Sequence, residues 1–130
     1  MRALLPPGWP RPKGYANGIS ARGRLIVTAG VVGWNADEQF EHDDLAGQFR
    51  QALLNIRAIL AEDGAGPEHI VRMTWYVTGI PEYRASLKEI GAAYKELIGK
   101  NFPTMAVVGV TELVEPMAKI EIETMAVVPE

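Results

Sequence analysis

The sequence contains no cysteine, and this absence excludes several kinds of site. Without a thiol the chain can form neither a disulfide nor a thiolate metal site, and it has no cysteine nucleophile. It has only two histidines, His42 and His69, which lie far apart in the chain with no motif joining them. Metal sites need clustered ligands at defined spacings, so we predict that the protein binds no metal.

The chain also lacks an excess of positive charge. Its 13 lysines and arginines are outnumbered by 16 aspartates and glutamates, which gives a net charge of −3 at pH 7. Nucleic-acid-binding proteins neutralise phosphates with clustered basic residues, so we expect no nucleic-acid partner. No apolar run reaches the roughly 18 residues of a membrane helix, and the proline-rich N-terminus does not resemble a signal peptide. We therefore expect a cytoplasmic protein with no membrane partner.

Two common catalytic or ligand-binding motifs are absent as well. Neither serine, Ser20 or Ser86, lies in a Gly-x-Ser-x-Gly context, so the sequence does not indicate a serine triad. No glycine-rich loop of the Walker or dinucleotide-binding type is present. The sequence therefore gives no reason to expect a nucleotide cofactor.

What the chain does contain is the pattern of one α+β domain. Its 130 residues, 48% of them hydrophobic, are enough for a single buried core. Residues 1–12 hold several prolines and are expected to form an extended N-terminal arm. The single domain is expected to span residues 13–130.

Hydrophobic periodicity predicts the elements of this domain. Apolar and β-branched runs predict strands at residues 15–19, 24–29, 70–77, 105–110 and 120–126. We expect the first two of these strands to form a hairpin. Apolar residues at steps of three and four predict a helix that begins after Asp43 or Asp44, and a second helix that begins at Pro81. The predicted order is β-β-α-β-α-β-β.

Two helices can cover only one face of the predicted sheet. The strand at 70–77 has apolar residues on both faces, with Ile70 and Tyr76 on one face and Met73 and Trp75 on the other. Strands with this pattern are covered on both sides. Because no further element is available, we expect an oligomer whose sheets pack together, with a ligand site between subunits.

Glu121 is the strongest candidate for chemistry. The last predicted strand alternates, so Glu121 points away from the face that Ile120 and Ile122 bury. A carboxylate at this position can act as a general acid or as a base that positions water, or it can simply pair with a lysine or arginine. Trp34 and Met105 are candidates to line an apolar pocket, and the alternative for both is ordinary packing.

Several motifs together make the sequence similar to the Rid family, the YjgF-like enamine and imine deaminases. They span most of residues 13–128 and comprise Gly14-Tyr15, Ile26-Val-Thr-Ala-Gly30, Gln48-x-x-x-Ala-Leu-x-Asn55, Ile70-Val-Arg-Met-Thr-Trp-Tyr-Val77, Phe102-Pro-Thr-Met105 and Lys119-Ile-Glu-Ile-Glu-Thr-Met-Ala126. The resemblance implies a chorismate-mutase-like α+β fold, with a mixed sheet and two helices on one face. It also implies a homotrimer that binds a small-molecule ligand in clefts between its subunits.

The activity implied by the resemblance is hydrolysis of a reactive enamine or imine, such as 2-aminoacrylate, to a keto acid and ammonia. No metal or cofactor takes part in it. Tyr15, Gly30 and Glu121 match residues of the family's site. The arginine that binds the substrate carboxylate in such members is replaced here by Met105, and a cysteine often found two residues later is replaced by Val107.

The residues that flank Gly30 differ from the family pattern too, since a serine is replaced by Ala29 and a glutamine by Val31. These differences remove polar anchors from the cleft and add apolar side chains. Loss of one charged hydrogen-bonding anchor costs on the order of 1.5–3 kcal/mol of binding. We therefore interpret the chain as an arginine-less Rid paralogue whose main substrate is not 2-aminoacrylate.

A larger, less charged enamine or imine would fit a cleft formed by Tyr15, Trp34 and Met105. In this hypothesis Glu121 positions water and supplies the proton to the leaving amine. The alternative is a ligand-binding trimer without catalytic activity, in which Glu121 only donates or accepts a hydrogen bond. Ribonuclease activity, a third hypothesis, is disfavoured by the negative charge and by the absence of a catalytic histidine pair.

Overall fold

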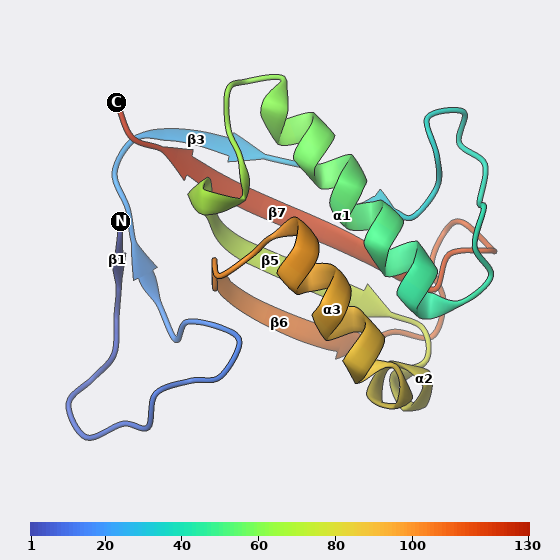
Figure 1. The fold of residues 1–130 in the computed structure, drawn as a ribbon, viewed down its shortest axis with the longest axis horizontal. Helices are drawn as coiled ribbons and strands as arrows, with labels where there is room; N and C mark the ends of the chain where they lie inside the picture. The colour runs from blue at the N-terminus through green and yellow to red at the C-terminus, as the bar shows by residue number, and fades with distance from the viewer.

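A computed structural model describes residues 1–130, and its centre is a mixed five-stranded sheet (Figure 1). The strands are β3 (Arg24–Val27), β4 (Val31–Val32), β5 (Ile70–Val77), β6 (Thr104–Gly109) and β7 (Ile120–Val128). They lie in the order β3-β7-β5-β6, and β4 also pairs with β7. Only β5 and β6 are parallel, whereas β7 is antiparallel to each of its neighbours. The edge position of β6 leaves one side of this strand free to form a site.

Two helices, α1 (Leu45–Ala61) and α3 (Leu87–Leu97), cover one face of the sheet (Figure 1). Of the two aspartates predicted as possible caps, Asp44 caps α1, because its carboxylate accepts a hydrogen bond from the backbone N of Gly47 at 2.9 Å. The second predicted helix is divided into α2 (Ile80–Ala85) and α3, because the backbone of Ser86 leaves the helical region. A 3-10 helix, η1 (Pro67–His69), precedes β5. The prediction of an α+β fold with a mixed sheet and helices is confirmed.

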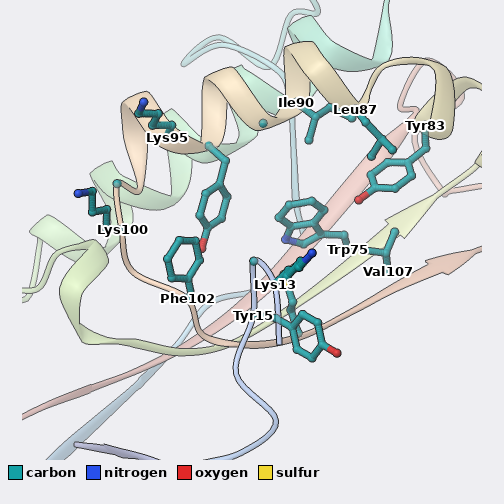
Figure 2. Close-up of a pocket in the computed structure, with 15 residues that line it drawn as sticks. Lys13, Tyr15, Trp75, Tyr83, Leu87, Ile90, Lys95, Lys100, Phe102 and Val107 are labelled. Carbon is teal, nitrogen blue, oxygen red and sulfur yellow. The ribbon is translucent and has the colours of Figure 1, made fainter. Parts of the chain in front are cut away.

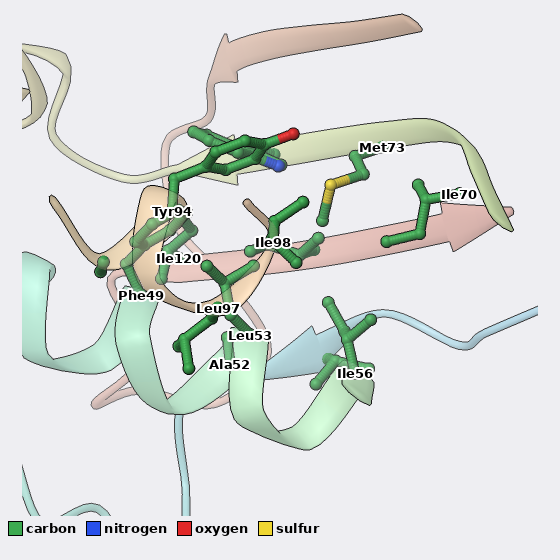
Figure 3. Packing of buried hydrophobic residues seen from close by; sticks show 14 of the residues in the cluster. Phe49, Ala52, Leu53, Ile56, Ile70, Met73, Tyr94, Leu97, Ile98 and Ile120 are labelled. Carbon is green, nitrogen blue, oxygen red and sulfur yellow. The ribbon is translucent and has the colours of Figure 1, made fainter. Parts of the chain in front are cut away.

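The core lies between the two helices and the sheet (Figure 3). Phe49 and Leu53 of α1 and Ile120 and Ile122 of β7 are fully buried within it. The alternation predicted for β7 is confirmed, because Glu123 points to the opposite face and is exposed. This burial provides most of the free energy that holds the helices on the sheet.

The face predicted for Ile70 is wrong. Ile70 is only 2% exposed and belongs to the same core cluster as Met73 and Trp75. The register between β5 and β7 shifts between Ile70 and Arg72, which marks a β-bulge. One extra residue reverses the alternation of a strand, so the bulge turns Ile70 towards the helices.

The predicted hairpin of residues 15–19 with 24–29 is also wrong. Strand β2 (Ile19–Ser20) pairs with β1 (Arg2–Ala3) in a separate two-stranded sheet, and β3 pairs with β7. Gly23 has a φ of +147°, and a Cβ atom there would lie 2.1 Å from the carbonyl oxygen of Val128. This close approach directs the chain onto the edge of β7 instead of back along β2.

The second face of the main sheet carries exposed apolar side chains. Leu25 and Val27 of β3 are 62% and 59% exposed, and Met125 of β7 and Val108 of β6 are also exposed. In Figure 1 the helices lie on the other side of the sheet. An exposed apolar surface on a sheet is typical of a protein interface.

No helix of the chain combines the length and the hydropathy needed to cross a bilayer.

Candidate functional site

A cavity of about 670 Å³ lies between α3 and the edge of the sheet (Figure 2). Met105 and Val107 project from the helix-facing side of β6, and Trp75 lies opposite Val107 on β5. Leu87 and Ile90 of α3 close the other side. The cavity exists because β6 is an edge strand, so α3 packs over a sheet that ends beneath it.

Aromatic rings form much of the wall of this cavity. The rings of Tyr94 and Phe102 are stacked with their centroids 6.4 Å apart, and Trp75 lies 6.5 Å from Tyr83 in an edge-on arrangement. Burial raises the pKa of Tyr94 to about 12 and also raises the pKa of Tyr83. Both phenols are therefore protonated at neutral pH, and neither can act as a general base there.

The N-terminal segment completes the cavity and contributes Tyr15 and Lys13. The backbone N of Ala16 donates to the carbonyl oxygen of Pro103 at 3.1 Å, which attaches this segment to the chain just before β6. Gly14 has a φ of +81°, a conformation that favours glycine. The structure thus brings together three of the predicted site residues, namely Tyr15, Met105 and Val107.

Glu121 and Gly30 form a second group on the open face of the sheet. A Cβ atom on Gly30 would lie 2.5 Å from Oε2 of Glu121, so the absence of a side chain makes room for the carboxylate. Glu121 is half-buried and forms no ion pair with a lysine or arginine of its own chain. Val31, by contrast, pairs with Ile122 and directs its side chain into the core.

These two groups do not meet within one chain. Strand β5 separates β7 from β6, and strands lie about 4.8 Å apart, so Glu121 is roughly 10 Å from Met105 in the direction across the sheet. Their partners on β5, Tyr76 and Met73, are three residues apart, which adds roughly 10 Å along the strands. The two side chains also point to opposite faces, because Glu121 pairs in register with Tyr76 and Met105 with Met73. A ligand in the cavity is therefore out of reach of Glu121 of the same chain.

Trp34 lies outside the cavity, in the loop that follows β4. Its ring packs on Phe40 with centroids 5.9 Å apart. Asn55 of α1 donates hydrogen bonds from Nδ2 to the carbonyl oxygens of Val32, at 3.1 Å, and Trp34, at 2.7 Å. The chain does not bring Trp34 and Met105 together, and Asn55 holds the Trp34 loop against α1.

Sequence reasoning did not identify several of the residues that line the cavity. Trp75 and Tyr94 followed the apolar pattern of a strand and a helix, and nothing in that pattern separates a cavity wall from a packed interior. Lys13, Lys95 and Lys100 also line the cavity. The one signal in the sequence was that Tyr94 and Phe102 flank Lys95 and Lys100 near the end of the second helix.

No group of three or more His, Cys, Asp or Glu side chains is arranged to hold a metal ion. His69 has a structural role, since its Nδ1 accepts a hydrogen bond from the backbone N of Gly66 at 3.0 Å.

Comparison with known proteins identifies the family of this chain. The family described as endoribonuclease L-PSP matches residues 10–128. The chain is 34% identical over 129 residues to a RutC family protein from Aquifex aeolicus, with 98% of this chain and 99% of that protein covered. This chain belongs to the Rid/YjgF/L-PSP family.

Two further comparisons place this Rid-family protein among relatives of known fold and activity. It is 30% identical to the 2-iminobutanoate/2-iminopropanoate deaminase of Escherichia coli, with 87% of this chain and 86% of that protein covered. Its fold matches the solved structure of the Rid-family protein YyfB from Yersinia pestis with a TM-score of 0.81. That match has 30% sequence identity and covers 98% of each chain.

Proposed function

We propose that this Rid-family protein hydrolyses the C=N bond of an imine, or of the enamine that tautomerises to it, in a substrate with a large apolar body. The observation that carries the proposal is Glu121, whose carboxylate is half-buried against Gly30 with no cationic partner in its own chain. A carboxylate in this state is available to exchange protons with water and with an amine. The activity of the E. coli relative, which is named for the deamination of 2-imino acids, supports the reaction class.

In the proposed reaction Glu121 holds a water molecule beside the imine carbon. Its carboxylate takes a proton as the water oxygen forms a bond to that carbon, and it returns a proton to the nitrogen. The resulting carbinolamine then loses its hydroxyl proton, which Glu121 passes to the nitrogen as the C=O bond forms and the C–N bond breaks. The products are a carbonyl compound and ammonia. Every proton in this sequence comes from water or Glu121, so the reaction needs no oxidant and no cofactor.

The proposed assembly is a homotrimer in which Glu121 of one subunit faces the cavity of the next. This arrangement would bring Glu121 of one subunit close to Met105 of the next, although the two residues lie far apart within a single chain. The exposed apolar side chains of Leu25, Val27 and Met125 support burial of the open sheet face in such an assembly. The active cleft would then lie between subunits.

The proposed substrate is larger than 2-aminoacrylate or its imine. The family's carboxylate-binding arginine corresponds here to Met105, whose side chain faces aromatic and aliphatic residues in the cavity. A three-carbon imino acid would leave most of about 670 Å³ unfilled and would have no guanidinium to bind. An imine with an aromatic side chain would fill the same space with apolar contact.

The experiment uses imines generated in situ by an L-amino acid oxidase from phenylalanine and from alanine. We expect the protein to accelerate ammonia release from the phenylalanine-derived imine, and Glu121→Gln to abolish the acceleration. Glu123→Gln is the matched control, since Glu123 is two residues away on the same face and hydrogen-bonded to Tyr76. Faster hydrolysis of the alanine-derived imine would overturn the substrate assignment.

The alternative function is ligand binding without catalysis on the same fold. The unpaired Glu121 and the preformed apolar cavity are equally suited to holding a ligand. Absence of acceleration for every imine, together with retained ligand binding in Glu121→Gln, would favour this alternative.

A further inference from the structure

We propose that Thr28 is a positioning residue for the Glu121 carboxylate. Its hydroxyl holds a β-bulge at residues 28–30, and this bulge sets Gly30 against Glu121 on the open face of the sheet. The inference rests on the proposed function in taking Glu121 as the reacting group. It adds a residue that acts through the backbone and does not line the cavity between α3 and β6.

A change of register along β7 marks the bulge. Val27, the last residue of β3, pairs with Met125. Val31, the first residue of β4, pairs with Ile122. The four steps from residue 27 to residue 31 therefore lie opposite only three steps on β7, so residues 28–30 contain one extra residue. Strands β3 and β4 are thus one strand along β7 that a bulge interrupts.

The exposure of the two valines agrees with this bulge. Residues four positions apart on a regular strand point to the same face. Val27 is 59% exposed on the open face, but Val31 is buried in the core. Because neighbours in a strand alternate, Gly30 faces away from the core, as Glu121 does beside Ile122. Without the extra residue, position 30 would pair with Ile122 and face the core, away from Glu121.

The hydroxyl of Thr28 completes the hydrogen bonding across the bulge. The backbone N of Thr28 donates to the carbonyl oxygen of Thr124 at 2.9 Å. The backbone N of Thr124 donates to Oγ1 of Thr28 at 3.1 Å, so a side-chain oxygen replaces the carbonyl that a regular ladder would supply. The same hydroxyl donates to the carbonyl oxygen of Ala29 at 2.8 Å. It therefore both accepts and donates within the bulge.

These bonds fix the backbone just before Gly30. A Cβ atom on Gly30 would lie 2.5 Å from Oε2 of Glu121, so the backbone there packs closely against the carboxylate. Beyond Gly30, the side chain of Asn55 donates to the carbonyl oxygen of Val32, the residue that pairs with Glu121. Gly30 thus lies between two polar anchors, and Thr28 is the one within the bulge.

Thr124, on the opposite strand, provides a matched control. It is 2% exposed, and its own Oγ1 has no hydrogen-bond partner. Thr124→Val therefore removes a hydroxyl that makes no bond, and it keeps the backbone N–H that donates to Thr28. Thr28→Val removes the hydroxyl that accepts this bond. The two substitutions make the same chemical change, so a difference between them reports the role of the Thr28 hydroxyl.

The first experiment uses NMR and does not depend on catalysis. In Thr28→Val the backbone N–H of residue 124 loses its acceptor, so we expect its protection against hydrogen exchange to fall by about 10-fold or more. Thr28→Ser should restore this protection, and Thr124→Val should retain it. The ¹³C signal of the Glu121 carboxyl group should shift in Thr28→Val alone. Either full protection or an unshifted carboxyl signal in a folded Thr28→Val protein would overturn the proposal.

The second experiment separates positioning from a general structural role by the kinetics of the imine assay. Thr28 does not line the cavity, so Thr28→Val should lower kcat for the phenylalanine-derived imine by about 10-fold and leave KM nearly unchanged. Thr28→Ser and Thr124→Val should keep the kcat of the natural protein. An equal loss of kcat in Thr124→Val would overturn the proposal, because that hydroxyl makes no bond.

A double variant tests whether Thr28 acts through Gly30. Gly30→Ala displaces the carboxylate directly, so the bulge has nothing further to position in that background. We therefore expect Thr28→Val combined with Gly30→Ala to have the kcat of Gly30→Ala alone. Multiplication of the two single losses would overturn the proposal, since Thr28 would then act by another route. Thr28→Ala, which also lacks the hydroxyl, replaces Thr28→Val in each test if the valine variant fails to fold.

These measurements separate the inference from the proposed function. If the natural protein hydrolyses no imine, the proposed function fails, and the exchange and carboxyl signals still decide whether Thr28 positions Glu121. If Thr28→Val hydrolyses imines as fast as the natural protein, the proposed function stands and the inference fails.

Discussion

The substitution Gly30→Ala tests whether the position of the Glu121 carboxylate matters for function. The added Cβ atom would lie 2.5 Å from Oε2 and 2.8 Å from Cδ of Glu121, where an ordinary contact is at least 3.4 Å. The carboxylate must therefore move by roughly 1 Å, which it can do by rotating its own side chain. Such a rotation costs about 0.5–1.5 kcal/mol, so we expect the free energy of unfolding to fall by no more than this.

The effect on turnover should be much larger than the effect on stability. A reacting group displaced by 1 Å costs on the order of 100-fold in rate, so we expect kcat for the phenylalanine-derived imine to fall by about that factor. The assay is ammonia release, with thermal unfolding measured on the same preparation. Retention of the original kcat by a folded Gly30→Ala protein would refute the assignment of Glu121 to the reaction.

Gly33→Ala is the matched comparison, because its conflict involves backbone atoms. A Cβ atom on Gly33 would lie 2.2 Å from the carbonyl oxygen and 2.7 Å from the Cα of Gln48 in α1. The helix backbone cannot rotate away, so this variant should lose about 1–3 kcal/mol of stability. The pair of variants therefore separates loss of function at a folded site from loss of the fold.

Three further predictions concern stability. Gln48 is 1% exposed and makes three hydrogen bonds to backbone groups, two of them to residues 117 and 119. Gln48→Leu should therefore lower the free energy of unfolding, measured in urea, by roughly 2–4 kcal/mol. A decrease of less than about 1 kcal/mol would contradict this. Asp44→Ala should remove the N-cap of α1 and cost about 1 kcal/mol, whereas Asp43→Ala, which makes no capping bond, should be nearly neutral. Burial raises the pKa of Tyr94 from 10.0 to about 12, so above pH 10 the unfolded phenol ionises while the folded one does not. Stability should then fall by about 1.4 kcal/mol per pH unit between pH 10 and 12 from this group, and Tyr94→Phe should lose this dependence.

The local hydrophobic pattern was sufficient to predict the helices and strands that bury one regular face. The alternation of β7 and the spacing of Phe49, Leu53 and Ile56 in α1 appear in the structure as predicted, because each reflects burial on one side of a regular element. The cap depends on one side chain and its own helix, so the sequence could narrow it to Asp43 or Asp44, and the structure shows Asp44. The family could also be predicted, since its motifs extend over most of the chain.

Pairing partners and irregular positions could not be predicted in this way. β2 pairs with β1 rather than β3, because Gly23 allows the chain to approach Val128 at the end of β7. The bulge in β5 moved Ile70 to the core by one extra residue, and no alternation signals such an insertion. Both depend on contacts between segments far apart in the sequence, which a local period does not contain.

For the candidate site, the sequence by itself determined which residue types stand at the candidate positions: a carboxylate at 121, a glycine at 30, and a methionine at 105, where the resemblance to the family implies a carboxylate-binding arginine. Only the tertiary structure decided how they are grouped. It placed Glu121 and Met105 on opposite faces of the sheet with a strand between them, and it gathered Lys13, Lys95, Lys100 and the Trp75 indole around one cavity. The physical reason is that the residue type determines which chemistry a side chain can perform, whereas strand order and register determine which other groups that side chain can contact.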